Sequence, residues 1–331
     1  MKSKASRVTI VFGIIIAVIM STISVCYGKE DQSFTIYWEN DGTFVKPYQR
    51  SDRHYTDGSK IVYTQQPDSN WLKDFGRWNN FGQDGQTQDV KTALGYFFGQ
   101  NMYTPDHVDN PKERDRHDMV FAGWLYGGVF AQRRAKSEME HFELNIGVIG
   151  PSSIAGRTQH VVHNALNINE PEGWDGQLGD EAAADFTWFK RQYLDARPLR
   201  RTSNFDTQLE YGFTAGTVHR DAILGIIVRA GINLPEDFGP GRLEAPDCAI
   251  ASDSDKLKHF YIFSRVGGKL VEYNRFLTGL ETETAVGQLQ AGVAFQYKTF
   301  EIRYSQTFLT REYKKQPEAD SYATLVLSYR F

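Results

Sequence analysis

Alternation of apolar and polar residues in short segments along the whole chain constrains its fold more than any other feature. The last ten residues show the pattern most clearly, because Ala323, Leu325, Leu327, Tyr329 and Phe331 share one face and polar side chains occupy most of the other. A repeat of two residues is typical of a β-strand. No 3.6-residue apolar repeat extends over a long stretch, so the sequence predicts an all-β fold.

The composition fits strands that have one apolar and one polar face. Aromatic residues make up 14% of the 331 residues and 29 residues are glycine, yet charged residues reach 24%. The aromatic content excludes a disordered chain, and a helical polytopic membrane protein would need spans of roughly 20 consecutive apolar residues. The net charge of −4 argues against a nucleic-acid-binding protein, which carries a basic surface.

About twelve segments alternate in this way, and single-chain bacterial barrels use even strand numbers. The segments are roughly 34–39, 58–64, 92–102, 119–131, 138–148, 183–194, 207–217, 222–232, 258–276, 284–298, 300–308 and 322–331. Gly267 and Gly268 lie inside 258–276, where an even count favours a kink in one long strand over a hairpin turn. We therefore predict a transmembrane antiparallel β-barrel of about 12 strands, with a short helix over 158–166 in an extracellular loop.

The N-terminus has the features of a secretory signal peptide. Three basic residues precede an apolar run over 8–25, and small residues lie near Gly28. We predict cleavage after residue 28, which gives a signal peptide of 1–28 and one barrel domain of 29–331. An uncleaved anchor helix is the alternative, although the run is at the short end for a span. Cleavage leaves Cys248 as the one cysteine, so no internal disulfide is expected.

An alternating terminal strand that ends on an aromatic residue, here Phe331, resembles the assembly signal of bacterial outer-membrane barrels. It implies recognition by the barrel-assembly machinery and a location in the bacterial outer membrane, and we expect a monomer. With both termini periplasmic, the loops at 40–57, 103–118, 149–182 and 309–321 face the cell exterior. Two long connections, 65–91 and 233–257, fall on the periplasmic side, where short turns are usual and no pattern accounts for them.

Polar clusters flanked by glycine gather in the outward loops. They are Glu39-Asn40-Asp41-Gly42, Asp52-Arg53-His54-Tyr55-Thr56-Asp57-Gly58, the stretch from Gly147 through Gln159 to His163, and Glu170-Pro171-Glu172-Gly173-Trp174-Asp175-Gly176-Gln177. Because these loops share one side of the barrel, their side chains can meet at one mouth. Asn-Asp-Gly alone is an ordinary turn signature, so the density of clusters supports a functional site more than any single motif does.

Taken together, these residues resemble the lipid A 3'-O-deacylases of the LpxR family, which are outer-membrane barrels of twelve strands. The resemblance is carried by Glu39-Asn40-Asp41 with Phe44, Asp52 through Gly58, Ala122-Gly123-Trp124-Leu125-Tyr126, Gly147-Val148-Ile149-Gly150-Pro151, Gln159 with His163, Gly173 through Leu178, and Asp237-Phe238-Gly239-Pro240. It implies a calcium-dependent esterase that hydrolyses the 3'-O-linked acyloxyacyl ester of lipid A in lipopolysaccharide. It also implies that the site faces the cell exterior, between the outer barrel wall and a loop helix.

The resemblance assigns the active site to Asn40, Asp41, Thr56 and His163. An imidazole has an ordinary pKa of about 6.5 and can take a proton from water, so His163 is the candidate base. The candidate calcium ligands are oxygen atoms of Asn40, Asp41, Thr56 and Glu170, because Ca²⁺ prefers oxygen donors and polarises an ester carbonyl as a Lewis acid. Asp41 either binds the metal or fixes the tautomer of His163, and both roles fit the sequence.

Several polar residues have other interpretations. His160 belongs to the same predicted helix as the candidate base and is the alternative base. His54 is expected in a loop near the lipid headgroups. Arg53, Arg114 and Arg116 are candidates to bind the phosphates of lipid A through paired hydrogen bonds.

Two other functions fit a barrel of this kind. An outer-membrane phospholipase would use a Ser-His pair, for which Ser152 and Ser153 are the nearest candidates, although no Gly-X-Ser-X-Gly elbow occurs. A passive channel or structural barrel would be supported by a ring of like charges in the lumen, and the predicted inward residues show none. The aromatic residues expected in the wall or the membrane girdles are Trp124, Tyr126, Trp174 and Trp188.

Overall fold

The computed structural model describes residues 32–42, 52–82, 90–106, 108, 117–167, 171–195, 201–250 and 257–331. Outside the described residues lie the predicted signal peptide, Phe44, Arg114, Arg116 and Glu170. In the part of the chain that the structure describes, no helix combines the length and the apolar character needed to cross a membrane.

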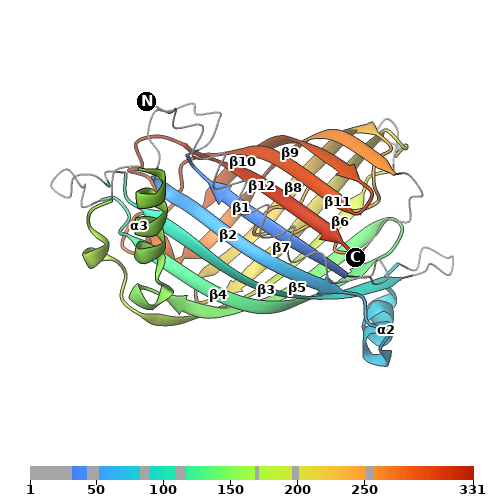
Figure 1. Cartoon of the computed structure of the whole chain (residues 1–331), viewed down its shortest axis with the longest axis horizontal. Helices are drawn as coiled ribbons and strands as arrows, with labels where there is room; N and C mark the ends of the chain where they lie inside the picture. The colour runs from blue at the N-terminus through green and yellow to red at the C-terminus, as the bar shows by residue number, and fades with distance from the viewer. Residues whose placement is uncertain are drawn as a thin grey trace.

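Twelve antiparallel strands of the described residues form a closed barrel, which confirms the predicted fold (Figure 1). They are β1 (Gln32–Asn40), β2 (His54–Gln65), β3 (Lys91–Thr104), β4 (Ala122–Arg134), β5 (Glu138–Ile149), β6 (Glu181–Tyr193), β7 (Phe205–Gly216), β8 (His219–Ile232), β9 (Lys258–Asn274), β10 (Ala285–Tyr297), β11 (Phe300–Leu309) and β12 (Asp320–Arg330). Each strand pairs with its sequence neighbours, and β1 pairs with β12 to close the barrel. We call the end where β1 begins and β12 ends the terminal end. The opposite end carries helix α3 (Ala155–Leu166) and is called the α3 end.

The glycine pair of β9 lies inside one long strand, as predicted. A Cβ atom on Gly267 would lie 2.3 Å from the carbonyl oxygen of Leu224, and one on Gly268 would lie 2.6 Å from that of Val286. Glycine therefore allows the strands on both sides of β9 to approach closely at this point.

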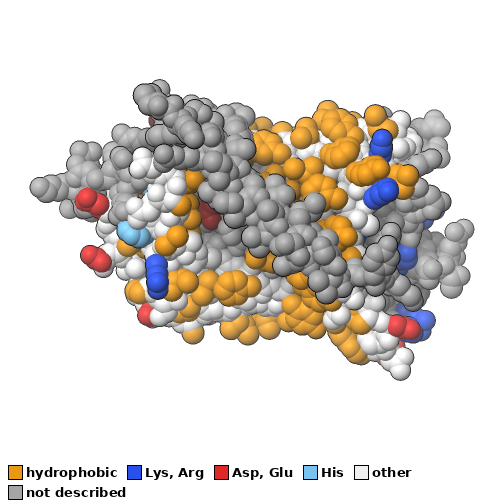
Figure 2. All heavy atoms as spheres, in the orientation of Figure 1, with side chains coloured by type: hydrophobic (Ala, Val, Ile, Leu, Met, Phe, Trp, Pro, Cys, Tyr) orange, Lys and Arg blue, Asp and Glu red, His pale blue; other side chains and the backbone are white. Residues whose placement is uncertain are grey.

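The outward side chains of the strands form an apolar belt. Phe98, Ile146, Val266 and Leu270 are each more than half exposed. Figure 2 shows apolar side chains across the middle of the visible face, with charged side chains towards the two ends. This distribution is the one expected for a barrel whose middle is surrounded by lipid.

The lumen carries many polar side chains, and the described part of the long connection between β8 and β9, 233–250, lies inside it. Inside it, the guanidinium groups of Arg191 and Arg265 both bond to Glu210 at 2.8 Å. The backbone N–H of Leu243 donates to Glu39 at 3.1 Å, and Arg191 donates to the carbonyl oxygen of Phe238 at 2.6 Å. This segment, described over 233–250, is therefore a plug that satisfies buried charges, which accounts for its length and argues against a passive channel.

Candidate active site

Helix α3 lies against the outer face of the barrel wall and packs on β3 and β4. Gln100 of β3 donates from Nε2 to the carbonyl oxygen of Ser153, just before the helix, at 2.6 Å. A Cβ atom on Gly123 of β4 would lie 2.1 Å from Ser153 Oγ and 2.3 Å from Ala155 Cβ. A residue without a side chain is therefore needed for the helix to reach the wall. The predicted loop helix is present and begins three residues earlier than 158.

A β-bulge at Thr56 places this residue beside α3. The pairing of β2 with β3 skips one position, so Thr56 is an extra residue in β2. Its hydroxyl lies 2.6 Å from Thr104 Oγ1, and the Thr104 hydroxyl donates to the carbonyl oxygen of Asp52 at 2.7 Å. Bulges are common next to active sites because they re-aim side chains. The prediction that Thr56 belongs to the loop at 40–57 is wrong, because β2 already begins at His54.

Asn40 and Asp41 lie at the end of β1, next to the bulge. Asn40 donates from Nδ2 to the carbonyl oxygen of Thr56 at 3.1 Å and to Asp57 Oδ2 at 3.2 Å. The backbone N–H of Asp41 donates to the same Thr56 carbonyl at 3.2 Å. Asp41 Oδ2 accepts the backbone N–H of Arg53 at 2.8 Å. Three of the predicted site residues therefore form one hydrogen-bonded group.

His163 faces this group from α3. The side chain is almost fully buried, and its Nε2 lies 3.5 Å from Asp52 Oδ1. Gln159, one turn earlier, donates to the same carboxylate oxygen at 3.0 Å, and Trp174 Nε1 donates to Gln159 Oε1 at 2.8 Å. His160, the alternative base, is exposed and makes its 3.0 Å hydrogen bond within the helix. Asp52 is not among the predicted site residues, although it begins the polar motif of residues 52–58.

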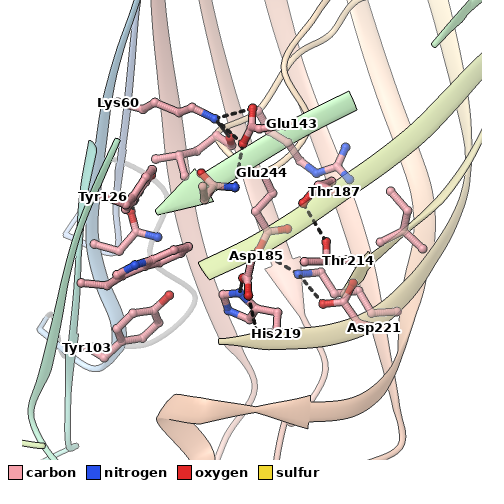
Figure 3. Close-up of a pocket in the computed structure, with 17 residues that line it drawn as sticks. Lys60, Tyr103, Tyr126, Glu143, Asp185, Thr187, Thr214, His219, Asp221 and Glu244 are labelled. Atoms are coloured by element: carbon pink, nitrogen blue, oxygen red, sulfur yellow. Dashed lines mark hydrogen bonds and ion pairs between the residues drawn. The ribbon is translucent and has the colours of Figure 1, made fainter. Parts of the chain in front are cut away.

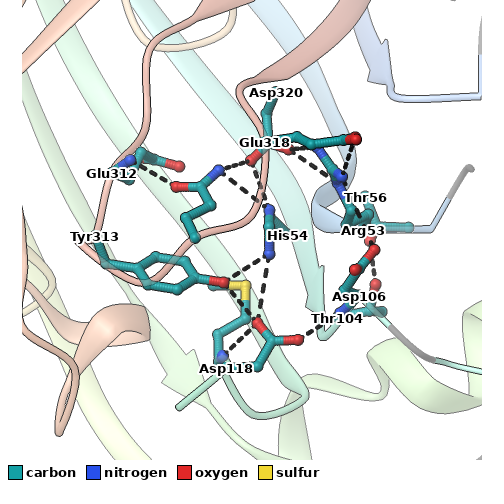
Figure 4. A network of polar contacts seen from close by, with 12 residues as sticks. Arg53, His54, Thr56, Thr104, Asp106, Asp118, Glu312, Tyr313, Glu318 and Asp320 are labelled. Carbon is teal, nitrogen blue, oxygen red and sulfur yellow. Dashed lines mark hydrogen bonds and ion pairs between the residues drawn. The ribbon is translucent and has the colours of Figure 1, made fainter. Parts of the chain in front are cut away.

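Residues 52–54, which we call the strap, lie along the rim of the barrel. The contacts of the strap hold Asp52 against α3. Asp52 and His54 adopt positive φ angles of 60° and 58°, which are uncommon for residues other than glycine. Asp320 binds the two following side chains of the strap, accepting from Arg53 at 2.7 Å and facing His54 Nδ1 at 2.7 Å (Figure 4). Asp41 holds the strap from the other side through the Arg53 backbone.

The other nitrogen of His54 contacts two further loops. Its Nε2 lies 2.9 Å from the Tyr313 hydroxyl and 3.4 Å from Asp118 Oδ1 (Figure 4). Tyr313 also donates to Asp118 at 2.7 Å. Burial alone would raise the pKa of Asp118, but the hydrogen bonds that it accepts, first of all from His54, hold this pKa below its ordinary value. The strap is therefore tied to loops far away in the sequence.

Two predictions about this region are wrong. His54 is 1% exposed, so it is not a loop residue near the headgroups. Arg53 is 8% exposed and its guanidinium group is engaged by Asp320 and by Glu318 at 3.1 Å, so it is buried in protein contacts and not presented to lipid phosphates. Both acidic partners lie more than 260 residues away in the chain, where no local pattern indicates them.

The family model described as "Outer membrane protein LpxR" matches residues 11–331. The chain belongs to the LpxR family. Among solved structures, this LpxR-family chain is similar to "LpxR from Salmonella typhimurium", with a TM-score of 0.72 at 18% identity over 90% of this chain and 100% of that chain. A match to the translocator domain of autotransporter NalP from Neisseria meningitidis has a TM-score of 0.38 at 9% identity, over 99% and 97% of the two chains. No curated protein sequence matches the chain.

The donor atoms of this LpxR-family site suit a hard cation. Asn40, Asp41 and Thr56 offer amide, carboxylate, hydroxyl and carbonyl oxygens, and Asp52 adds a second carboxylate nearby, which are the ligand types that Ca²⁺ takes. Among the described residues, however, no group of three or more His, Cys, Asp or Glu side chains is arranged to hold a metal. The predicted acidic ligand Glu170 lies outside the described residues.

The two candidate serines of a Ser-His hydrolase make other contacts. Ser152 Oγ donates to Asp180 at 2.8 Å, and the buried Ser153 donates to the carbonyl oxygen of Gly150 at 2.6 Å. Ser153 also packs against the wall glycine of β4. These contacts give both serines a structural role at the start of α3 and leave the phospholipase hypothesis without support at this position.

A polar pocket lies in the lumen, separate from the residues beside α3 (Figure 3). Trp124 and Tyr126 line it with ring centroids 4.3 Å apart, so of the two predicted places, wall or girdle, they occupy the wall and face the lumen. The register of β4 turns both rings inwards. Charged groups of the pocket are paired, for example Lys60 with Glu143 at 2.9 Å. None of the predicted site residues lines this pocket, so we assign the site to the outer face of the wall.

Proposed function

We propose that this chain is an outer-membrane lipid A deacylase that hydrolyses the 3'-O-linked acyloxyacyl ester. The observation that supports the proposal most is the position of His163 and Asp52 outside the barrel wall, beside Asn40, Asp41 and Thr56. Because this face is continuous with the apolar belt, an ester of a membrane lipid can reach it without leaving the leaflet. We place the α3 end at the cell exterior, where lipid A resides.

In the proposed reaction, His163 takes a proton from water while the water oxygen attacks the ester carbonyl. Asp52, 3.5 Å from the ring, stabilises the imidazolium that results. Polar groups of Asn40 and Thr56 face the oxyanion that develops on the carbonyl oxygen. The bond between the acyl carbon and the sugar 3'-oxygen then breaks, and His163 returns the proton to that oxygen. The products are a free carboxylic acid and a lipid with a 3'-hydroxyl group.

Calcium is part of the proposal. Asn40, Asp41, Thr56 and Glu170 would hold the ion through oxygen atoms, and the ion would supply Lewis-acid polarisation of the ester carbonyl. We further propose that the protein acts as a monomer and that its C-terminal Phe331 is recognised by the barrel-assembly machinery.

Mass spectrometry of lipid A from cells that express the full chain tests this function. The chain should remove the mass of the 3'-acyloxyacyl group, and His163→Ala should reduce the rate by about 10²- to 10⁴-fold, the range for loss of a general base. His160→Ala, on the exposed side of the same helix, is the matched control and should keep the activity. Chelation should abolish deacylation and added Ca²⁺ should restore it. Unchanged lipid A with the wild-type chain, or full activity of His163→Ala, would overturn the proposal.

A further inference from the structure

The long connection between β2 and β3 carries helix α2 (Asn70–Arg77), which stands on the outer face of the barrel at the terminal end (Figure 1). Leu72 on the inner side of the helix is fully buried. Trp71 and Trp78 are instead 55% and 59% exposed, although tryptophan is among the largest apolar side chains. Trp71 lies on α2, and Trp78 directly follows it as the first residue of the 3-10 helix η2 (Trp78–Asn80). Two exposed indole rings on these adjoining elements call for an explanation beyond the packing of the helix on the wall.

Arg133 of β4 fixes α2 in one position. Its guanidinium group donates to the carbonyl oxygens of Phe75 and Trp78 at 3.0 and 2.7 Å, which satisfies the C-terminal end of the helix. The same group is paired with Glu140 of β5 at 2.6 Å and is 3% exposed. Phe75 also packs edge-on against the outward ring of Phe142 at 5.5 Å. The exposed side of α2 is therefore held at a defined height on the barrel.

The strand register gives that height. Tyr96, Val129 and Leu144 lie opposite one another on β3, β4 and β5 and are all exposed members of the apolar belt. The row with Arg133 and its partner Glu140 lies four residues further along the strands towards the terminal end. Strands rise about 3.3 Å per residue and tilt by about 40°. The row of Arg133, to which α2 is attached, is therefore about 10 Å closer to the rim than the row of Val129. An apolar band of a barrel is about 25 Å tall, so a row about 10 Å from a residue row in the middle of the belt would lie near the edge of the hydrocarbon layer.

The charges of α2 are balanced. Lys73 forms an ion pair with Asp68, and the remaining charged side chains of the helix are Asp74 and Arg77, one of each sign. A balanced surface with exposed indole rings suits a zwitterionic headgroup layer, because indole combines an apolar ring with one polar N–H group. An anionic membrane surface would instead favour a basic helix face.

We propose that α2 is an interfacial helix, and that Trp71 and Trp78 insert into the headgroup region of the phospholipid leaflet at the terminal end. The partner is the leaflet itself, reached as a continuation of the lipid-facing belt. The long connection between β2 and β3 thus anchors the barrel at a fixed depth on the side opposite α3. This inference does not depend on the enzymatic activity.

Quenching of tryptophan fluorescence by brominated lipids tests the proposal. The full chain is reconstituted in phosphatidylcholine vesicles with bromine atoms placed near the headgroup or deep in the acyl chains. The emission of α2 is taken as the difference between wild type and Trp71→Phe/Trp78→Phe. We expect this emission to be quenched more by the shallow than by the deep bromine, and quenching to be the same in vesicles that contain anionic phosphatidylglycerol.

Two other tryptophan residues serve as controls. Trp188, which lies opposite Phe142 on the outer face, marks the neighbouring row of the wall and should respond to deeper bromine than α2 does. Trp124 in the lumen is 5% exposed and should respond to neither label. Correct folding of each variant is checked by heat-modifiable electrophoretic mobility. Emission of α2 that aqueous iodide quenches and bromolipids do not would overturn the proposal, as would a response identical to that of Trp124.

Discussion

Replacement of Asp320 by Asn is the sharpest test of how the strap positions Asp52. The Asp320 carboxylate accepts from Arg53 at 2.7 and 3.1 Å and faces His54 Nδ1 at 2.7 Å, and it is 8% exposed. The substitution keeps the size of the side chain and removes its charge. Asp320 also accepts from Gln316 at 2.8 Å, but its contacts with Arg53 and His54 are the ones that lead to Asp52, so we expect the substitution to affect catalysis through the strap (Figure 4).

The magnitude follows from the contacts. Breaking a buried ion pair costs about 3–5 kcal/mol, and Arg53 keeps its bond to the half-exposed Glu318, so we expect a loss of about 2–3 kcal/mol. Two non-glycine residues at positive φ, Asp52 and His54, store at least about 2 kcal/mol of backbone strain. The free energy lost with these contacts is therefore comparable with the backbone strain that they balance. Without them, we expect residues 52–54 to relax away from their positive φ angles. At about 1.4 kcal/mol per tenfold change in rate, a full transfer of this loss to the transition state would lower kcat by about 30- to 150-fold.

Initial rates of deacylation in lipid vesicles give kcat and KM separately. We expect Asp320→Asn to lower kcat and leave KM unchanged, and Asp320→Glu to restore part of the rate. Asp185→Asn is the matched control: Asp185 is also buried and faces a histidine, His219, at 2.8 Å, but it lies away from the strap. Wild-type kcat for folded Asp320→Asn, or an equal loss in the control, would refute the positioning role.

Three further predictions concern other parts of the barrel. Gly123→Val should push α3 off the wall and abolish activity while the barrel still folds, as judged by heat-modifiable mobility, because the added Cβ overlaps Ser153. Burial and the charge of Asp320 raise the pKa of Glu312 to about 7 in the folded chain. Between pH 5 and pH 7 the unfolded chain therefore loses this proton while the folded chain keeps it, which stabilises the unfolded state. We expect the melting temperature to fall over this range and Glu312→Gln to reduce the fall. Replacing 239–248 by a short Gly-Ser linker should open the lumen, and an absence of conductance in planar bilayers would count against the plug.

Much of the fold was predictable because lipid and lumen impose the same two-residue repeat on every strand. The strand count, the long β9 and the loop helix follow from that repeat and from turn residues. The plug and α2 were not predictable in the same way. The buried guanidinium groups of Arg191 and Arg133 bond to backbone carbonyls of these two connections, and a carbonyl acceptor has no sequence signature.

The candidate site was predicted in part. The family resemblance implies Asn40, Asp41, Thr56 and His163; in the structure the first three share hydrogen bonds, and His163 lies against Asp52. Asp52 was missed because its role depends on a bulge and on a strained backbone, and the acidic residue that anchors its neighbours lies at the other end of the chain. Pairings across more than 260 residues arise from barrel closure, not from local sequence.

The location of the site on the outer wall has a physical advantage for a lipid substrate. Moving an acyl chain of about ten methylene groups from hydrocarbon into water would cost about 8 kcal/mol, at about 0.8 kcal/mol for each group. The lumen is a poor alternative for this acyl chain, because paired charges such as Lys60 with Glu143 line it and the segment over 233–250 lies inside it. A site beside α3 avoids this penalty, since the chain stays among lipids while the ester meets His163. In the proposed function the barrel serves two purposes at once: its outer face carries the groups that we propose to react, and Asp320 of β12 anchors the strap that positions Asp52.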